Sequence, residues 1–198
     1  MNNKLTTKQY RHYDYWCWNN YFTTSEIKKI NKIIKKNIIG KENPSMAASA
    51  FNNKKLKNLK TEIISLSVIS KFVKPLMKNI RYCNDKNFQY DLHTNFELED
   101  TGNYNTYSSK TKSGYKWHTD DSGDIRFDLK FTVLINLSEQ KYTGGDFKIF
   151  KNESYTVDGF KKPGSVLMFK SSLNHCVTPV LSGERITFTI AVFGPKWK

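Results

Sequence analysis

The chain is poor in cysteine, histidine and arginine, and it lacks a long apolar run. Its three cysteines, Cys17, Cys83 and Cys176, are an odd number in no metal-like spacing, so a disulfide framework is not expected. The first sixteen residues lack the apolar stretch of a signal peptide, and no apolar-leaning segment is long enough to span a membrane. We therefore expect a soluble protein of the reducing cytoplasmic interior.

The scarcity of arginine argues against a nucleic-acid reader. A net charge of +14 and a pI near 9.6 would suit a polyanionic partner. The arginines are only Arg11, Arg81, Arg126 and Arg185, however, and the remaining positive charge is lysine spread along the whole chain. Surfaces that bind nucleic-acid phosphates usually contain arginine, whereas dispersed lysine is typical of a solvated surface. Nucleic acid stays a minority hypothesis for the partner.

The chain's 198 residues, 38% of them hydrophobic, suffice for one core. We expect a single domain over residues 1–198, with a helical N-terminal part at 1–87 and a β-rich core at 88–198. The run from Thr23 to Gly40 predicts an amphipathic helix, because Thr23 and Glu26 can form a capping box and isoleucines share one face. The run at 58–83 also has helical periodicity, with a boundary expected at Pro75.

From Phe88 onward the pattern changes to short alternating runs rich in aromatic and β-branched residues. Glycine-containing turn signals separate them, such as "YTGGD" and "LSGER". Strands at this spacing predict two packed sheets. The expected fold class is mainly β with N-terminal helices, built on a double-stranded β-helix (jelly-roll) core. The expected strands are "FQYDLHTNFELE", "KWHTD", "DLKFTVLINLS", "DFKIFK", "SYTVDGF", "GSVLMFK", "HCVTPVL" and "RITFTIAVFG".

Two of the four histidines are candidate metal ligands. His118 and Asp120 are two residues apart in a strand-like run, so both side chains point to one face of the sheet. An imidazole and a carboxylate on one face are two parts of the 2-His-1-carboxylate triad that holds non-haem Fe(II). His175 follows an apolar strand that can reach the same barrel mouth. His12 and His93 are expected to be packing or surface histidines, and H-x-D alone is a weak signal.

Arg185 is the only arginine in the last third of the chain, and it begins an otherwise apolar strand. Burying a guanidinium is costly unless an anion meets it, and its planar fork suits a carboxylate. Two kinds of anion could pair with Arg185. One is a local acid such as Glu184 or Asp146, and the other is a dicarboxylate cosubstrate bound near the metal triad.

From about Asn58 to the C-terminus the chain resembles the Fe(II)/2-oxoglutarate-dependent oxygenases, in particular the prolyl-4-hydroxylase-like branch. Four landmarks occur in the family's order, which makes the resemblance far more specific than H-x-D alone. They are "YSSKTKSGYKWHTD", "DLKFTVLINLSEQKYTGGDFKIF", "KKPGSVLMFKSSLNHCVTPV" and "SGERITFTIAVF".

This resemblance implies Fe(II), 2-oxoglutarate as cosubstrate and O2, and it leaves ascorbate open as a further cofactor. It implies that His118, Asp120 and His175 ligate the iron. Halogenating relatives lack the carboxylate, so Asp120 favours hydroxylation.

The resemblance also implies a set of cosubstrate residues. Arg185 would bind the distal carboxylate of 2-oxoglutarate, and Thr187, on the same face, would be a second contact. Tyr107 falls near the family tyrosine that reaches the cosubstrate or an iron-bound water. Asn136 occupies a strand position where some relatives place a tyrosine against the same carboxylate.

The branch acts mostly on peptidyl residues, notably proline, so the resemblance implies a protein or peptide substrate and release of succinate and CO2. Oxygenases of nucleic acid, a small molecule or a glycan are alternatives. Nucleic-acid relatives usually carry a second arginine six residues beyond the first, where this chain has Ala191. Another alternative is a non-catalytic jelly-roll module. Asp121 and Arg126 could line the pocket rim, although a solvated turn is favoured there.

Overall fold

The computed structural model of the chain describes residues 13–41, 57–93, 101–121 and 128–196. Its two longer helices are α1 (Thr24–Lys36) and α2 (Ser70–Asn87), and its short 3-10 helices are η1 (Leu66–Ile69), η2 (Ser109–Thr111) and η3 (Asp158–Lys161). Its strands are β1 (Tyr15–Trp18), β2 (Ile38–Lys41), β3 (Lys60–Ser65), β4 (Thr101–Ser108), β5 (Tyr115–His118), β6 (Leu129–Asn136), β7 (Thr143–Gly144), β8 (Phe147–Phe150), β9 (Ser154–Thr156), β10 (Val166–Lys170), β11 (Asn174–Val177), β12 (Val180–Ser182) and β13 (Glu184–Phe193).

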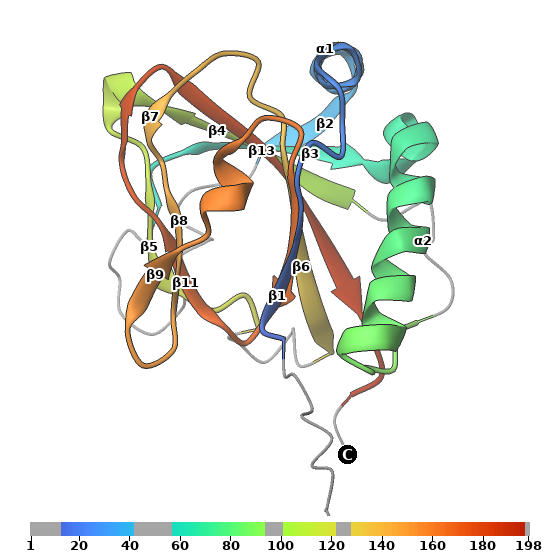
Figure 1. Cartoon of the computed structure of the whole chain (residues 1–198). Coiled ribbons are helices and arrows are strands. Elements are labelled where there is room, and N and C mark those ends of the chain that lie inside the picture. The colour runs from blue at the N-terminus through green and yellow to red at the C-terminus, as the bar shows by residue number, and fades with distance from the viewer. Residues whose placement is uncertain (1–12, 42–56, 94–100, 122–127, 197–198) are drawn as a thin grey trace, which may run out of the picture.

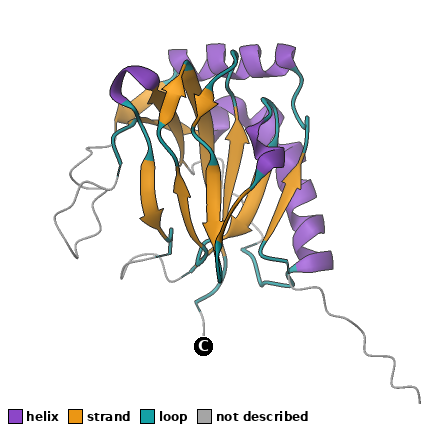
Figure 2. Ribbon diagram, turned by 60° about the vertical axis from the view of Figure 1, so that its left-hand side comes forward, coloured by secondary structure: helices purple, strands orange, loops and turns teal. Residues whose placement is uncertain are grey.

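Two β-sheets face each other, and α1 and α2 lie outside the larger one (Figures 1 and 2). The larger sheet has the strand order β1-β10-β6-β13-β4-β3-β2, and the smaller has the order β5-β11-β8-β9. A short ladder joins β12 and β7. This arrangement confirms the predicted mainly β fold with a jelly-roll core. None of the helices that the structure describes has both the length and the hydrophobicity needed to cross a membrane.

Side-chain alternation along the central strands divides the interior into two layers. On β6, Val133 and Ile135 join the cluster packed under the helices, and Phe188 and Ile190 on β13 do the same. The side chains between them point to the opposite face, toward the smaller sheet, because successive residues of a strand alternate. The helices therefore bury the outer face of the larger sheet and leave its inner face for the site.

The inner layer combines apolar side chains from both sheets. Leu134, Leu167 and Phe169 come from the larger sheet, and Phe147 and Ile149 come from the smaller. All five are buried. These contacts hold the sheets together and leave one end of the space between them to polar side chains.

The capping box predicted at the start of the first helix is confirmed. The Thr23 hydroxyl accepts from the Glu26 backbone N–H at 3.3 Å, and the Glu26 carboxylate accepts from the Thr23 N–H at 2.9 Å. The hydrophobic face carries Ile27, Ile30 and Ile34, which are all buried. The helix ends at Lys36, and the Ile38–Lys41 segment continues as strand β2 rather than as helix.

The helix predicted over 58–83 is wrong in its first part. Lys60–Ser65 form β3, which pairs with β2 on one side and β4 on the other. Its β-branched residues suit a pleated surface, and pairing with two neighbours outweighs the helical periodicity. Helix α2 begins only at Ser70 and continues through Pro75. With β1 and β2, three strands thus lie in the part of the chain that the sequence predicts to be helical.

Strand assignment in the core is largely confirmed, with two differences. The run predicted at 88–99 has no strand over 88–93, and its remainder lies outside the described residues. Strand β4 carries little hydrophobic pattern, yet it pairs with β3 and β13 in the middle of the larger sheet. Its small and polar residues face the space between the sheets, so packing there did not require an apolar alternation.

Replacing Thr23 by Ala removes the hydroxyl that caps α1 and should lower the free energy of unfolding by about 1 kcal/mol. Urea denaturation of the wild type and Thr23→Ala measures this, with Thr23→Ser as the control that keeps the hydroxyl. If both variants unfold at the wild-type midpoint, the capping box does not stabilise the fold.

Candidate active site

His118 and His175 lie directly opposite each other in the antiparallel pairing of β5 with β11. Asp120 follows β5, and its backbone N–H donates to the Ser171 carbonyl at 2.9 Å, which turns its side chain back toward the histidines. The Asp120 carboxylate oxygens lie 3.5 Å from His118 Nε2 and 3.6 Å from His175 Nε2. One ligand atom from each residue lies within 4.8 Å of the other two. In the part of the chain that the structure describes, this is the one such cluster.

Both imidazoles are oriented by their second ring nitrogen. His118 Nδ1 lies 2.7 Å from the Lys116 carbonyl oxygen, and His175 Nδ1 lies 2.8 Å from that of Leu173. A carbonyl can only accept, so each Nδ1 carries the proton and donates it. Each Nε2 therefore presents a lone pair, as a metal ligand requires.

Aromatic rings hold these imidazoles in place. The Tyr115 ring stacks on the His118 ring with centroids 3.5 Å apart and an interplanar angle of 16°. The rings of Phe147 and Phe169 flank His175 at centroid distances of 5.3 Å and 4.7 Å. The ligand atoms are thus fixed before any metal binds.

The protonation states of His175 and Asp120 match what a metal needs. Burial lowers the pKa of His175 to about 4, so its imidazole is neutral near pH 7. Burial acts to raise the pKa of Asp120, but contact with His118, the charge of His175 and the Thr132 hydroxyl outweigh it and bring the pKa to about 2. A neutral imidazole at His175 and an ionised carboxylate at Asp120 are donors of the kind that a non-haem iron site uses.

A cavity of about 340 Å³ opens beside this cluster between the two sheets. All three cluster residues line it, together with Tyr107 from β4 and Phe147 from β8. Asn103, Asn105 and Thr189 also line it and contribute amide and hydroxyl groups. This volume is within the range of pockets that take small molecules or a single side chain.

Arg185 is almost fully buried, with 1% of its surface exposed. Its Cζ lies 4.8 Å from the Tyr107 ring centroid and 5.6 Å from that of Phe160. Neither terminal guanidinium nitrogen has a hydrogen-bond partner among the described residues. Within the same set of residues, Asp146 pairs with Lys161 and not with Arg185. Because a buried, unpaired guanidinium is costly, its position favours an anion from outside the chain over a local salt bridge.

Arg185 lines a second cavity of about 90 Å³ rather than the larger one. Phe147 borders both cavities, and Tyr107 borders the larger one while its ring lies under the guanidinium. Burial raises the pKa of the Tyr107 phenol, and the neighbouring Arg185 charge opposes this rise. Aromatic side chains thus lie between the His118–Asp120–His175 cluster and the buried cation, and Phe147 is shared by the two cavities.

The remaining site candidates lie in different places. Thr187 is buried on the same face of β13 as Arg185, and it borders neither cavity. The Asn136 side-chain N–H₂ donates to the Tyr142 hydroxyl and to the carbonyls of Phe160 and Lys161, so its amide is engaged within the protein. A cosubstrate contact for either residue stays a prediction.

His93 lies apart from the metal cluster, and its backbone N–H donates to the Phe193 carbonyl. His12 and Arg126 lie outside the described residues. The structure adds Thr132 to the site, whose hydroxyl donates to Asp120 Oδ2 at 2.6 Å. Thr132 is twelve residues from Asp120 in another strand, and only the fold brings the two together.

Comparison with known proteins agrees with this geometry. The profile of the 2OG-Fe(II) oxygenase superfamily matches residues 102–193. This range includes His118, Asp120, His175 and Arg185. The β-rich core of this chain is therefore similar in sequence to the 2OG-Fe(II) oxygenases. A PKHD-type hydroxylase of Synechococcus sp. (strain CC9605) is 40% identical over 79 residues, which are 39% of this chain and 35% of that protein. The chain thus matches about a third of the length of this curated relative.

Solved prolyl hydroxylases share the fold. A Pseudomonas putida prolyl-4-hydroxylase superposes with a TM-score of 0.66 at 14% identity, covering 93% of this chain and 94% of that one. The prolyl hydroxylase of Trichoplax adhaerens, solved with a hypoxia-inducible-factor peptide fragment, gives a TM-score of 0.66 at 18% identity, covering 91% and 84%. This likeness shows that the chain has the same jelly-roll fold as these two hydroxylases.

Replacing Thr132 by Val removes the hydroxyl that orients Asp120 while keeping the shape of the side chain. We expect the affinity for Mn(II) or Fe(II) to fall about tenfold, because residues that orient a ligand typically contribute this much. Equilibrium dialysis measures it. The control is Thr189→Val, because the hydroxyl of Thr189 accepts from the Asn105 amide and does not contact Asp120. Equal affinities of the two variants would show that Thr132 does not position the carboxylate.

Proposed function

We propose that residues 1–198 form a single Fe(II)- and 2-oxoglutarate-dependent dioxygenase domain that hydroxylates a peptidyl residue, with proline as the first candidate. One observation carries the proposal. The side chains of His118, Asp120 and His175 lie together beside one cavity. A second cavity, which shares Phe147 with the first, contains the buried Arg185, whose terminal nitrogens have no hydrogen-bond partner among the described residues. A metal and a carboxylate-bearing cosubstrate are the two groups that this pair of features would receive.

His118, Asp120 and His175 would hold the ferrous ion on one face and leave its remaining positions to cosubstrate and O2. The bound group supplies the oxidative decarboxylation of 2-oxoglutarate to succinate and CO2, coupled to hydroxylation of the substrate. The protein's part is orientation: the Lys116 and Leu173 carbonyls fix the imidazoles, and aromatic side chains exclude water around them.

Arg185 would bind the distal carboxylate of 2-oxoglutarate through two parallel hydrogen bonds. Such a partner would satisfy the two guanidinium nitrogens in a site where water is scarce. Tyr107 lies under the guanidinium and beside the metal cavity, so its hydroxyl is the candidate for contact with the cosubstrate chain. Thr187 is the next inward-facing residue of β13 and is the candidate for the second carboxylate contact.

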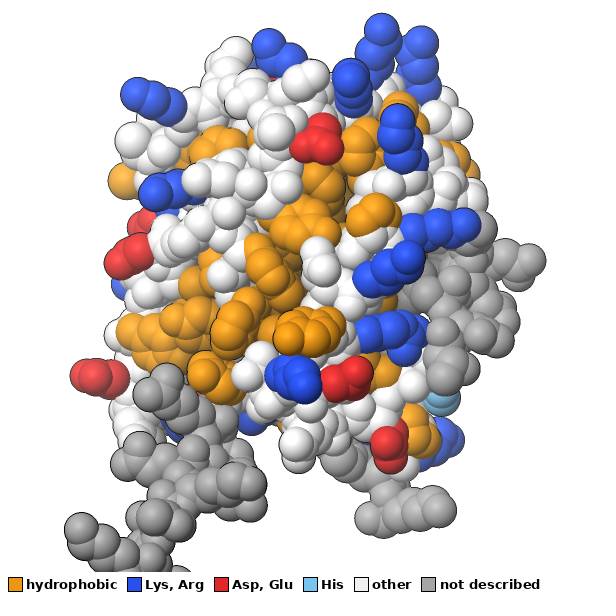
Figure 3. All heavy atoms as spheres, turned by 45° about the vertical axis from the view of Figure 1, so that its right-hand side comes forward, with side chains coloured by type: hydrophobic (Ala, Val, Ile, Leu, Met, Phe, Trp, Pro, Cys, Tyr) orange, Lys and Arg blue, Asp and Glu red, His pale blue; other side chains and the backbone are white. Residues whose placement is uncertain are grey.

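The proposal of a peptide substrate is supported by the PKHD-type relatives and by the prolyl hydroxylases that share the fold, one of them solved with a peptide. Nucleic acid has less support. On the face shown in Figure 3, Lys and Arg side chains are dispersed around a band of hydrophobic atoms. Ala191 lines the metal cavity at the position where nucleic-acid relatives usually carry arginine. The three free cysteines suit a cytoplasmic protein.

Replacing Arg185 by Ala should weaken 2-oxoglutarate binding about 100-fold, because two charge-assisted hydrogen bonds are lost in a buried site. Metal affinity should stay within about twofold of the wild-type value. Anaerobic titration of the Fe(II) protein, followed by the visible charge-transfer absorption of the chelate, measures the first, and dialysis measures the second. Arg81→Ala removes an arginine away from the site and serves as the control. Equal loss of metal and cosubstrate would assign Arg185 a structural role.

The peptide proposal predicts that proline-containing peptides stimulate conversion of 2-oxoglutarate to succinate and gain one oxygen atom. Mass spectrometry of the peptides and quantification of succinate measure both, with Asp120→Ala as the inactive control. Oxidation of single-stranded DNA, of a glycan or of a small metabolite in place of every peptide would move the substrate to that class. Absence of metal and cosubstrate binding would leave a non-catalytic jelly-roll module.

A further inference from the structure

The 90 Å³ cavity over Arg185 has two walls that belong to different segments of the chain. One wall is the turn from Tyr142 to Asp146, which contains β7 and leads into β8, and the other is the segment from Thr156 to Lys161 that contains η3. Arg185 is the one buried residue among the charged side chains of this lining. The accessibility of Arg185 to a ligand therefore depends on how these two walls are held together.

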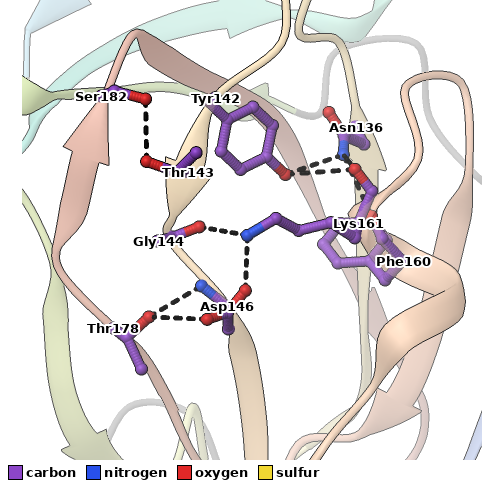
Figure 4. Close-up of polar contacts among 9 residues, drawn as sticks. All are labelled: Asn136, Tyr142, Thr143, Gly144, Asp146, Phe160, Lys161, Thr178 and Ser182. Atoms are coloured by element: carbon purple, nitrogen blue, oxygen red, sulfur yellow. Dashed lines mark hydrogen bonds and ion pairs between the residues drawn. The ribbon is translucent and has the colours of Figure 1, made fainter.

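Lys161 joins the two walls through both its side chain and its backbone (Figure 4). Its ammonium group donates to the Gly144 carbonyl and to the Asp146 carboxylate across the cavity. Its own carbonyl accepts from the Tyr142 hydroxyl at 3.3 Å and from Asn136 Nδ2 at 3.2 Å. The side chains of Lys161 and Asp146 are 35% and 37% exposed, so this bridge lies at the solvent side of a cavity whose arginine is buried.

The turn that receives Lys161 packs closely on the arginine. Gly144 and Gly145 have φ angles of +68° and +60°, which glycine adopts without strain. A Cβ on Gly145 would lie 2.9 Å from Arg185 Cδ and 3.0 Å from Val180 Cγ2, so there is no room for one. Any movement of this turn would therefore change the packing around the Arg185 side chain.

Asp146 is the acid of this turn, and its position is fixed from two sides. Its backbone N–H donates to the Thr178 hydroxyl at 2.8 Å, and its carboxylate pairs with Lys161 (Figure 4). Lys161 thereby neutralises a carboxylate that lines the same cavity as Arg185. The guanidinium is left for an incoming anion instead of an internal one.

We propose that Lys161 is a specificity-determining residue of this pocket, because its bridge to Gly144 and Asp146 fixes the length of the cavity over Arg185. The inference rests on the proposed function, in which Arg185 receives the distal carboxylate of 2-oxoglutarate. With the bridge closed, the pocket accepts 2-oxoglutarate and excludes 2-oxoadipate, which is one methylene longer. Rejection of one methylene by a close-packed wall is worth about tenfold or more in affinity.

The first test compares Lys161→Met with Lys162→Met, which makes the same charge change at the exposed neighbouring residue. Isothermal titration calorimetry of the full-length chain loaded with Mn(II) measures the dissociation constants of 2-oxoglutarate and 2-oxoadipate without turnover. The wild type and Lys162→Met should prefer 2-oxoglutarate about tenfold or more. Lys161→Met should bind 2-oxoglutarate about fivefold more weakly, which is the scale of a half-exposed ion pair, and its preference should fall below about threefold.

A second pair of variants separates the bridge from simple electrostatics. Asp146→Asn also breaks the ion pair, but it makes the cavity more positive. The bridge predicts a loss of preference for the shorter diacid, as in Lys161→Met, whereas attraction by charge alone predicts tighter binding of both diacids with unchanged preference. Asp158→Asn makes the same charge change in the lining of this cavity without removing a contact of Lys161, and it should keep the wild-type preference.

The outcomes distinguish this inference from the function on which it rests. If wild type binds Mn(II) but neither diacid, the cosubstrate proposal fails. If wild type prefers 2-oxoglutarate, Arg185→Ala loses it, and both Lys161→Met and Asp146→Asn keep the preference, the bridge is overturned while the function stands. Circular dichroism melts check that each variant folds, and Asp146→Asn decides the question if Lys161→Met does not fold.

Discussion

His118 and His175 face each other because β5 and β11 are antiparallel neighbours in the smaller sheet. A shift of one residue in this register would turn one imidazole to the outer face, since side chains alternate along a strand. The pairing of β11 with β8 on its other side holds the same register and places the Phe147 ring beside His175. The geometry of the His118–Asp120–His175 cluster thus depends on the register in which β11 pairs with its two neighbours.

The second constraint on the site is the buried charge of Arg185. Removing a guanidinium from water costs several kcal/mol, and this chain places no described carboxylate in its reach to offset that cost. The fold accepts it because β13 lies in the middle of the larger sheet, paired with both β4 and β6. A stable scaffold can therefore hold a buried cation, and Asp146, which lines the same cavity, pairs with Lys161 instead.

The sequence predicted the jelly-roll class, most strands and the convergence of His118, Asp120 and His175, for identifiable reasons. Strand alternation and glycine turns are local signals, and the ordered landmarks placed His118, Asp120 and His175 in three known positions of a family. Non-local contacts carried no such signal. The residues of β3 have helical periodicity, and its strand conformation depends on pairing with β2 and β4, which its own sequence does not indicate. Thr132 meets Asp120, and Lys161 meets Asp146, only through sheet stacking and turn geometry.

The most direct test is a crystal structure of the protein with Mn(II) and 2-oxoglutarate. The crystals are grown without oxygen, and the metal is located by its anomalous signal. The account predicts one metal peak within bonding distance of His118 Nε2, Asp120 and His175 Nε2, with the far carboxylate of the ligand on the Arg185 guanidinium. A metal bound elsewhere, or a ligand whose far carboxylate lies away from Arg185, would contradict it.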